Sequence, residues 1–230
     1  MNKLEKLEKK IKVTFRDKDI LKTALVHRSY INEHKSFELD HNERLEFLGD
    51  AVLELIVTEY LYLHFKNPEG ELTNWRSSLV NFKMLADRAE ELGLYPLMYM
   101  SRGEARDQSK KARSYILANA YEAIIGAIFI DQGLDAVKTF IIKHLIPELK
   151  QILEHKLYLD AKSNFQEKSQ EVHGVTPRYK ILKQRGPDHI KHFTVGVYLN
   201  RELIAQGEGT SKQEAETSAA ERGLKEKGWE

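Results

Sequence analysis

The chain has 230 residues, of which 41% are hydrophobic and 31% are charged, so it is long enough for one large or two modest domains with packed cores. It contains no cysteine, which excludes a disulfide framework and a thiolate metal site. The formal net charge is +1, and the part from Tyr158 onward carries 12 Lys and Arg against 11 Asp and Glu, so neither half is a basic block. Bulk charge therefore gives no support to nucleic-acid binding, which would have to rest on the local placement of charges.

Two features bear on location. The N-terminal segment MNKLEKLEKKIK alternates charged residues with leucine and lacks the continuous apolar core of a signal peptide. The most apolar run, residues 115–130, is short for a bilayer span and contains a carboxylate. We therefore expect a cytoplasmic protein that has no membrane partner.

Most of the first part of the chain is predicted to be helical, because apolar residues recur there at three- and four-residue spacing. The expected helices cover residues 21–26, 45–65, 79–92, 115–130 and 136–153. Turn-forming residues separate them at 67–70, at 93–96 and at Gly133. The polar segment 101–114 is expected to be a surface loop, or a helix start with flexible flanks.

A different pattern begins near residue 157. A helix is expected over residues 162–172, followed by strands over 178–184, 192–199 and 202–207. The middle strand, HFTVGVYL, has the β-branched and aromatic content that strands favour. A final helix is expected to begin at Thr210 or Ser211, with a glutamate three residues further on. Together these elements predict a compact α+β module.

Carboxylates occur at helical spacing inside two of the apolar segments. Glu43, Glu46 and Asp50 share one face of a helix, and Glu122 follows Asn119 by three residues in the most apolar run. A buried carboxylate without a partner is strongly disfavoured, so something positive should lie against these acids.

Spacing alone leaves two sources of positive charge open. The first is an internal ion pair from Arg28, Arg44 or His27, as in a helical structural protein. The second is a divalent cation, because hard cations prefer carboxylate and carbonyl oxygens. Four oxygen side chains would then converge at a helix crossing: Glu46, Asp50, Asn119 and Glu122.

The segment HNERLEFLGD, residues 41–50, resembles the signature of the ribonuclease III family. Further motifs of the family match as well: ALVHRSY at 24–30, Pro68-Glu69-Gly70 with Leu72 and Arg76, RGE at 102–104, and ILANAYEA at 116–123. The last part of the chain resembles a double-stranded-RNA-binding domain, including GPDH at 186–189 and SKQEAE at 211–216. The similarity covers nearly the whole chain in the family's two-domain order.

The resemblance implies an all-α ribonuclease III domain over residues 1–156, a linker over 157–161, and a small α-β-β-β-α RNA-binding domain over 162–228. The implied activity is hydrolysis of phosphodiester bonds in double-stranded RNA. The products would carry 5′-phosphate and 3′-hydroxyl ends with two-nucleotide 3′ overhangs, in the processing of ribosomal and messenger RNA.

The resemblance also implies the residues of the catalytic site. Glu46, Asp50, Asn119 and Glu122 would bind Mg²⁺, for which Mn²⁺ can substitute, with Asp50 and Glu122 as catalytic residues. The family usually has aspartate at position 119, and the uncharged Asn119 is expected to attract the ion less strongly. The alternative is a double-stranded-RNA binder that has lost the chemistry at Asn119.

Glu43 and Glu69 also fall on acidic positions of the family, and the resemblance gives them secondary roles near the substrate. It further implies a two-fold homodimer in which Phe47 enters the partner subunit. An ordinary core phenylalanine is the alternative that composition alone leaves open for Phe47.

In the second domain, the resemblance implies a set of residues that face RNA. Ser163, Gln166 and Glu167 on the first helix would face one minor groove. Pro187 and His189, in the turn between the first two strands, would enter the next minor groove. Lys212, at the start of the last helix, would meet phosphates together with the helix N-terminus.

Overall fold

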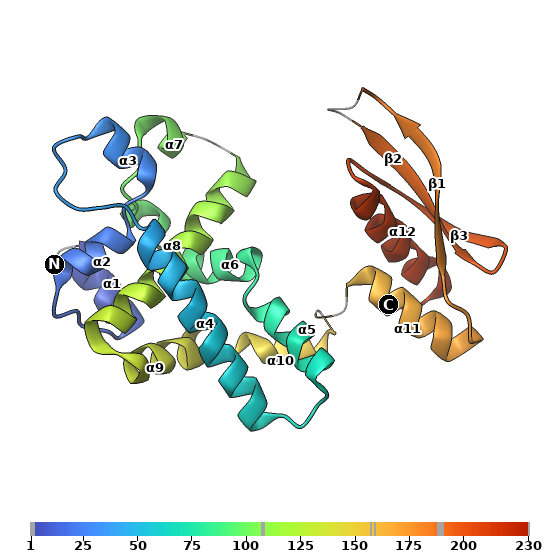
Figure 1. The fold of residues 1–230 in the computed structure, drawn as a ribbon, viewed down its shortest axis with the longest axis horizontal. Coiled ribbons are helices and arrows are strands. Elements are labelled where there is room, and N and C mark those ends of the chain that lie inside the picture. The colour runs from blue at the N-terminus through green and yellow to red at the C-terminus, as the bar shows by residue number, and fades with distance from the viewer. Residues whose placement is uncertain (1–2, 107–108, 157, 159, 188–190, 230) are drawn as a thin grey trace. The chain divides into compact units, whose positions relative to one another are not determined.

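The computed structural model describes residues 3–106, 109–156, 158, 160–187 and 191–229. The chain divides into two compact units, Met1–Tyr158 and Leu159–Glu230 (Figure 1).

The first unit is built of α-helices, one short 3₁₀ helix (Tyr95–Leu97) and connecting loops in the residues that the structure describes. The helices are α1 (Lys3–Ile11), α2 (Lys18–Ala24), α3 (Arg28–Glu33), α4 (Glu43–His64), α5 (Glu69–Leu79), α6 (Phe82–Leu92), α7 (Arg102–Arg106), α8 (Lys110–Gln132), α9 (Leu134–His144) and α10 (Glu148–Glu154). The expected all-α domain is confirmed.

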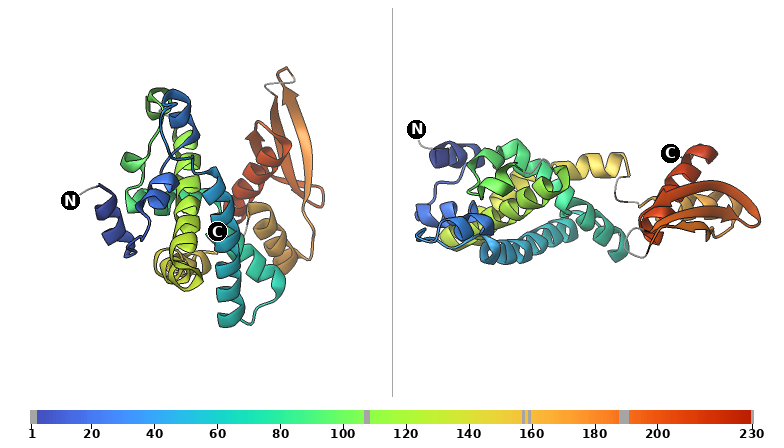
Figure 2. Two further views of the ribbon diagram at one scale, coloured as in Figure 1. Left: turned by 60° about the vertical axis from the view of Figure 1, so that its left-hand side comes forward. Right: turned by 90° about the horizontal axis from the view of Figure 1, so that it is seen from above.

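Helix α8 is the centre of the first unit, and α4 packs against it, crossing it in Figure 1 and lying beside it in the left view of Figure 2. Helices α2, α6 and α9 also contact α8, so most of its residues from Ile116 to Ile128 are buried. Within the described residues, α8 is the one helix long and apolar enough to cross a membrane by length and composition, and 61% of its most apolar window is buried inside the protein. A helix that is hydrophobic all round and enclosed in this way forms the core of its domain.

Two of the expected helices have different bounds in the structure. The expected helix over 79–92 starts three residues late, because the Asn81 side chain accepts a hydrogen bond from the Met84 amide at 3.0 Å and begins α6. The expected helix over 136–153 is two helices, α9 and α10, with Pro147 between them. Proline lacks the amide hydrogen and disfavours helix at the preceding residue.

Four α-helices in the described residues were not among the expected ones, and one of them is the short helix α3. Helix α1 buries Leu7 and Ile11, although its mean composition is strongly charged. Helix α5 follows Pro68 directly, and α7 lies in the segment expected to be a loop or helix start.

The second unit is an α-β-β-β-α module, as expected. Helix α11 (Ala161–His173) precedes the strands β1 (Arg178–Arg185), β2 (His192–Leu199) and β3 (Glu202–Gly209), and α12 (Lys212–Lys227) follows them. The strands pair antiparallel in the order β1-β2-β3, and both helices pack on one face of the sheet (Figure 1). Phe165 of α11 and Val197 of β2 are fully buried in the core between them.

The start of α12 has the predicted cap. The Ser211 hydroxyl accepts a hydrogen bond from the Glu214 amide at 3.1 Å. The Glu214 carboxylate in turn accepts a hydrogen bond from the Thr210 amide at 2.7 Å.

The two units divide between Tyr158 and Leu159, inside the expected linker over 157–161. Tyr158 contacts Trp75 of the first unit, with ring centroids 5.9 Å apart, and α11 already begins at Ala161. Residues 157 and 159 lie outside the described residues.

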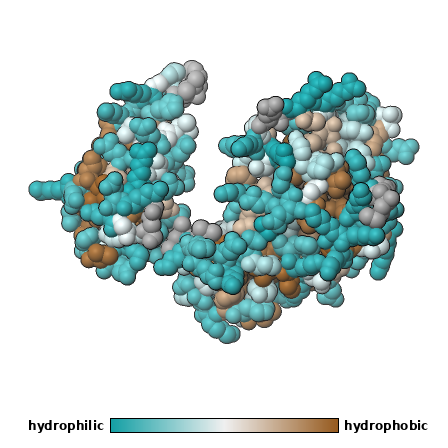
Figure 3. Space-filling view, turned by 180° about the vertical axis from the view of Figure 1, so that it is seen from behind, coloured by the Kyte–Doolittle hydropathy of each residue, from teal (hydrophilic) through white to brown (hydrophobic). Residues whose placement is uncertain are grey.

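On the face seen in Figure 3, hydrophobic side chains gather in separate patches on a largely hydrophilic surface.

Candidate active site and RNA-binding surface

Two glycines let α4 and α8 cross at backbone contact. A Cβ atom on Gly49 would lie 1.8 Å from the carbonyl oxygen of Glu122, and one on Gly126 would lie 2.2 Å from the carbonyl oxygen of Leu45. No larger residue fits at either position without moving a helix. The close approach of the helices at these glycines was not predicted from the sequence. The signal that could have indicated it is that each of the two helices carries a glycine near its acidic residues.

The crossing brings together four of the predicted site residues: Glu46 and Asp50 from α4, and Asn119 and Glu122 from α8. Burial, followed by the charges of Asp50 and Glu46, raises the pKa of Glu122 to about 7. Burial and the charge of Glu43 raise the pKa of Glu46, and a side-chain hydrogen bond from Asn119 partly offsets this. The negative charge of these carboxylates is therefore not balanced by positive charge around them.

Basic side chains do not supply the missing charge. In the described part of the chain, no Lys, Arg or His forms an ion pair with Glu46, Asp50 or Glu122. The Arg28 guanidinium lies 3.8 Å from Glu43, so the internal ion pair accounts for Glu43 alone.

The donor set fits a hard divalent cation. All four side chains offer oxygen, and Asn119 donates its amide hydrogen to Glu46, which leaves its carbonyl oxygen as the ligand atom. Among the described residues, no three His, Asp or Glu side chains already surround one ion-sized point. Binding would therefore require these side chains to turn toward the ion.

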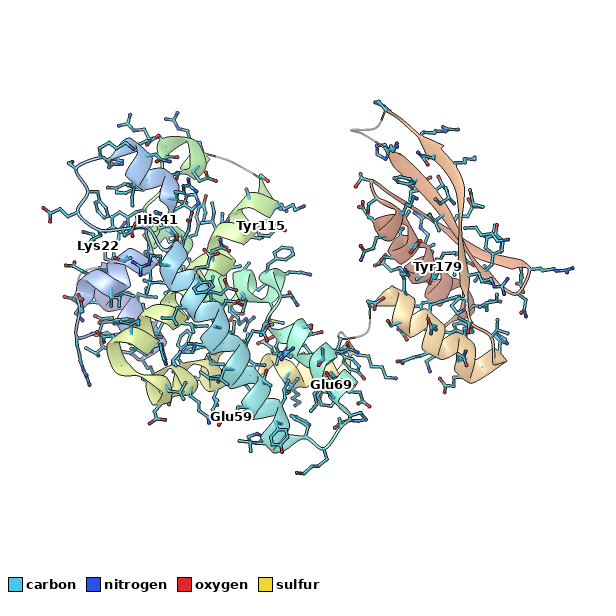
Figure 4. The ribbon with its side chains drawn as sticks, in the orientation of Figure 1. Lys22, His41, Glu59, Glu69, Tyr115 and Tyr179 are labelled. Atoms are coloured by element: carbon cyan, nitrogen blue, oxygen red, sulfur yellow. The ribbon has the colours of Figure 1, made fainter. Side chains whose placement is uncertain are left out.

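The two secondary acidic residues lie apart from each other. Glu43 is in the first turn of α4, and its carboxylate is 3.7 Å from His41. Glu69 begins α5 beyond the other end of α4, where it accepts a hydrogen bond from Thr73 at 3.0 Å (Figure 4). Since α4 is 22 residues long, about 30 Å separates its ends, and Glu69 does not join the cluster of its own chain.

Phe47 is not a core residue, since 81% of its surface is exposed. Further along the same face of α4, Leu55 is 58% exposed and Tyr62 is 71% exposed. We call these three residues the α4 stripe. A groove at the C-terminal end of the helix is lined by Thr58, Leu61, Tyr62, Phe65, Lys66, Asn67, Glu69, Leu72, Thr73 and Arg76.

In the second unit, Ser163, Gln166 and Glu167 line one shallow groove along α11. Gln170 lines the same groove and was not among the predicted residues, although it follows Gln166 by one helical turn. The Ser163 hydroxyl also donates to Asp160 at 2.6 Å.

The other predicted RNA-binding residues are at the ends of strands and helices. Pro187 is exposed after β1, and Lys212 is exposed at the first position of α12. His189 lies outside the described residues.

Comparison with known proteins identifies both units. A family model described as Ribonuclease-III-like matches residues 17–149, and one described as Double-stranded RNA binding motif matches residues 161–227. The chain is 44% identical to Ribonuclease 3 of Pelotomaculum thermopropionicum over 97% of its length and 92% of the relative. The chain belongs to the ribonuclease III family.

Other members of the ribonuclease III family agree. Ribonuclease 3 of Nitratiruptor sp. is 42% identical over 98% of this chain and 97% of its own. The nuclease domain of ribonuclease III from Campylobacter jejuni, solved at 2.2 Å, superposes with a TM-score of 0.57 and 41% identity, covering 64% of this chain and 97% of that domain. Another structure of that domain, described as flexible in a region involved in dimer formation, gives a TM-score of 0.55 and 42% identity, covering 61% of this chain and 94% of that domain.

As a ribonuclease III family member that carries the double-stranded RNA binding motif, the protein is an endoribonuclease of double-stranded RNA. The alternative of a non-catalytic RNA binder is not favoured.

Proposed function

We propose that Glu46, Asp50, Asn119 and Glu122 bind Mg²⁺, or Mn²⁺ in its place, and that Asp50 and Glu122 are the catalytic residues. The observation that supports this most strongly is the acidic cluster at the α4–α8 crossing, which has no basic partner in the described residues. The products are 5′-phosphate and 3′-hydroxyl ends with two-nucleotide 3′ overhangs. Residues 1–156 form the nuclease domain, and residues 162–228 form the RNA-binding domain, joined by 157–161.

The protein groups have separate tasks in this reaction. A bound divalent ion would lower the pKa of a water molecule and place positive charge beside the phosphate. Glu46, Asp50 and Glu122 would hold that charge, and Asn119 donates a hydrogen bond to the Glu46 carboxylate. The packed crossing keeps bulk water away from the inner side of Glu122.

We also propose a two-fold homodimer, formed through the α4 stripe. Exposed large apolar side chains along one helix face are unfavourable in a monomer. In an isologous interface, two antiparallel α4 helices place the Phe47 end of one against the groove at the other's C-terminal end. The same pairing brings Glu69 of the partner subunit near the acidic cluster, whereas Glu43 acts within its own chain.

The double-stranded RNA binding motif supports RNA binding by the second domain, and we propose which of its residues face the duplex. Ser163, Gln166 and Glu167 face one minor groove of the duplex, and Pro187 with His189 enter the next. Lys212 and the first amides of α12 bind phosphates. We propose that the enzyme acts in the cytoplasm on duplex segments of ribosomal and messenger RNA.

The test is cleavage of a long end-labelled duplex RNA in Mg²⁺, with the product ends identified. We expect 5′-phosphate ends and paired cuts from the wild type, and a rate at least about 100-fold lower for Glu122→Gln. Glu59→Gln is the matched control, because Glu59 lies on α4 but pairs with Lys138 at 2.5 Å on the outer surface. RNA binding without cutting in both the wild type and Glu122→Gln would refute the proposal.

A further inference from the structure

One stripe of α8 stays accessible while the rest of the helix enters the core. Lys111 and Tyr115 are exposed, and Asn119 and Glu122 are partly exposed. Residues 116–118 and 120–121 between them are buried. Steps of four, four and three residues keep these side chains on one helix face. The acidic cluster is therefore the inner end of a surface that continues toward the N-terminus of α8.

An aromatic pair lies at the outer end of this stripe. The ring of Tyr115 stacks on that of Phe82, the first residue of α6, with centroids 4.8 Å apart and planes 15° apart. Each residue is 44% exposed, so the pair keeps ring surface open to solvent. Figure 4 shows Tyr115 at the end of α8 that adjoins α6. We call Phe82 and Tyr115 the aromatic platform.

The charges beside the aromatic platform suit an anionic strand. Lys83 follows Phe82 and Lys111 lies one turn before Tyr115, and both are exposed. Arg113 belongs to a different surface, because it pairs with Glu90 at 2.5 Å and lies over the Tyr95 ring at 4.0 Å. Aromatic rings next to cations are how proteins hold single nucleic-acid strands, with the bases stacked and the phosphates neutralised.

The position of the aromatic platform relative to the acids fits a few nucleotides of RNA. Seven residues separate Tyr115 from Glu122, which is about 10 Å along the helix axis. A strand whose phosphate is cut at the acidic cluster would thus place a nearby nucleotide over the rings.

We propose that the aromatic platform stacks on an unpaired nucleobase next to the scissile phosphate. This inference rests on the proposed function, since it needs the cut strand to lie along α8. Bases inside an A-form duplex are stacked on one another and cannot reach a protein ring, whereas bulged or mismatched bases can be splayed out. The enzyme would therefore prefer duplex RNA that carries an unpaired nucleotide close to the cut.

A binding test reads the stacking without cleavage. The full-length protein carrying Glu122→Gln is mixed with a duplex that has 2-aminopurine as a single bulged base, and with a duplex in which the same base is paired. We expect quenching of fluorescence with the bulged base only. Tyr115→Phe should keep the quenching, whereas Tyr115→Leu, and independently Phe82→Leu, should remove it. Equal quenching with and without the ring at position 115 would overturn the inference.

A kinetic test uses otherwise wild-type protein. We expect kcat/KM for a duplex with one bulged nucleotide to exceed that for the perfect duplex by about 5- to 100-fold, from one stacked base. Tyr115→Leu should lose this preference and cut the perfect duplex within about twofold of the wild type. An equal loss on both substrates would contradict the inference, because the rings would then support the helices or the duplex as a whole.

The two tests separate the two claims. If the wild type cuts neither substrate, the proposed function fails, and the quenching result still decides whether the aromatic platform binds an unpaired base. Thermal melting of each variant shows that it is folded, and Phe82→Leu keeps the test decisive if Tyr115→Leu unfolds.

Discussion

Glu122 shows how one side chain links the fold to the chemistry. It belongs to the central helix, where most neighbours are buried and apolar, and its pKa is raised to about 7. Without a cation, the ionised Glu122 destabilises the folded protein, since burial and two nearby acids disfavour its negative charge. With a divalent ion, the same burial strengthens the attraction.

The raised pKa predicts a pH-dependent stability in the metal-free protein. Folding favours the protonated acid, so its contribution is complete below the unfolded pKa of about 4.5 and is lost as pH rises through the folded pKa of about 7. Glu122→Gln removes this loss. In EDTA above pH 7, the variant should melt higher than the wild type, by about 2–4 °C for each kcal/mol relieved.

The control for this experiment is Glu59→Gln, whose Tm relative to the wild type should not rise with pH in that range. A Glu122→Gln variant that melts lower than the wild type above pH 7 would mean that a positive group already neutralises the acid.

Asn119→Asp is predicted to change metal binding and apo stability in opposite directions. The added carboxylate attracts the ion by roughly 1 kcal/mol in a partly solvated site, which lowers the Mg²⁺ concentration for half-maximal cleavage about fivefold. The substitution also replaces the hydrogen bond to Glu46 by a like charge, so the metal-free protein should melt lower. An unchanged Mg²⁺ requirement would show that the amide at position 119 does not limit binding.

At the scale of elements, the α4–α8 crossing determines whether the site exists. Gly126→Ala would bring a Cβ to 2.2 Å from a backbone oxygen, so the helices must move apart. We expect a loss of at least about 2 kcal/mol in the free energy of unfolding, measured with urea, together with a loss of cleavage.

Gly70→Ala is the matched control for this prediction, because its Cβ would have nothing within 4 Å in helix α5. There we expect unchanged cleavage and a gain of up to about 1 kcal/mol from the reduced freedom of the unfolded chain. Similar effects of the two substitutions would argue against backbone contact at the crossing.

The helix pattern could be predicted from the sequence only where apolar spacing is strong. The middle of α4 and of α8 followed from it, and so did the strand β2 with its β-branched residues. Helix α1 could not, because its burial depends on two apolar residues meeting other helices. The acids of the site were found from their spacing, whereas the contact that unites them depends on tertiary packing at Gly49 and Gly126.

At the scale of the whole molecule, the α4 stripe predicts the assembly. Phe47→Asp puts a charge where an apolar ring would be buried in the partner subunit, so we expect the dimer dissociation constant to rise at least about 100-fold. Sedimentation at micromolar concentration measures this. Ile130→Asp, at a 58% exposed position on α8, should leave the dimer intact.

A wild-type protein that sediments as a monomer would contradict the proposed dimer.

The exposure of Phe47 could not be predicted from the sequence. Composition could not distinguish a core ring from an interface ring, because both are apolar residues beside polar ones on a helix. The two-domain order, by contrast, was predictable, since the pattern changes from helical spacing to strands near residue 157.

The most direct test of the account is anomalous scattering from a crystal of the full-length protein soaked in Mn²⁺. The account predicts a peak at the α4–α8 crossing, with oxygens of Glu46, Asp50 and Glu122 at about 2.0–2.2 Å. A peak absent from the crossing, with these three carboxylates bonded to arginine or lysine instead, would contradict it.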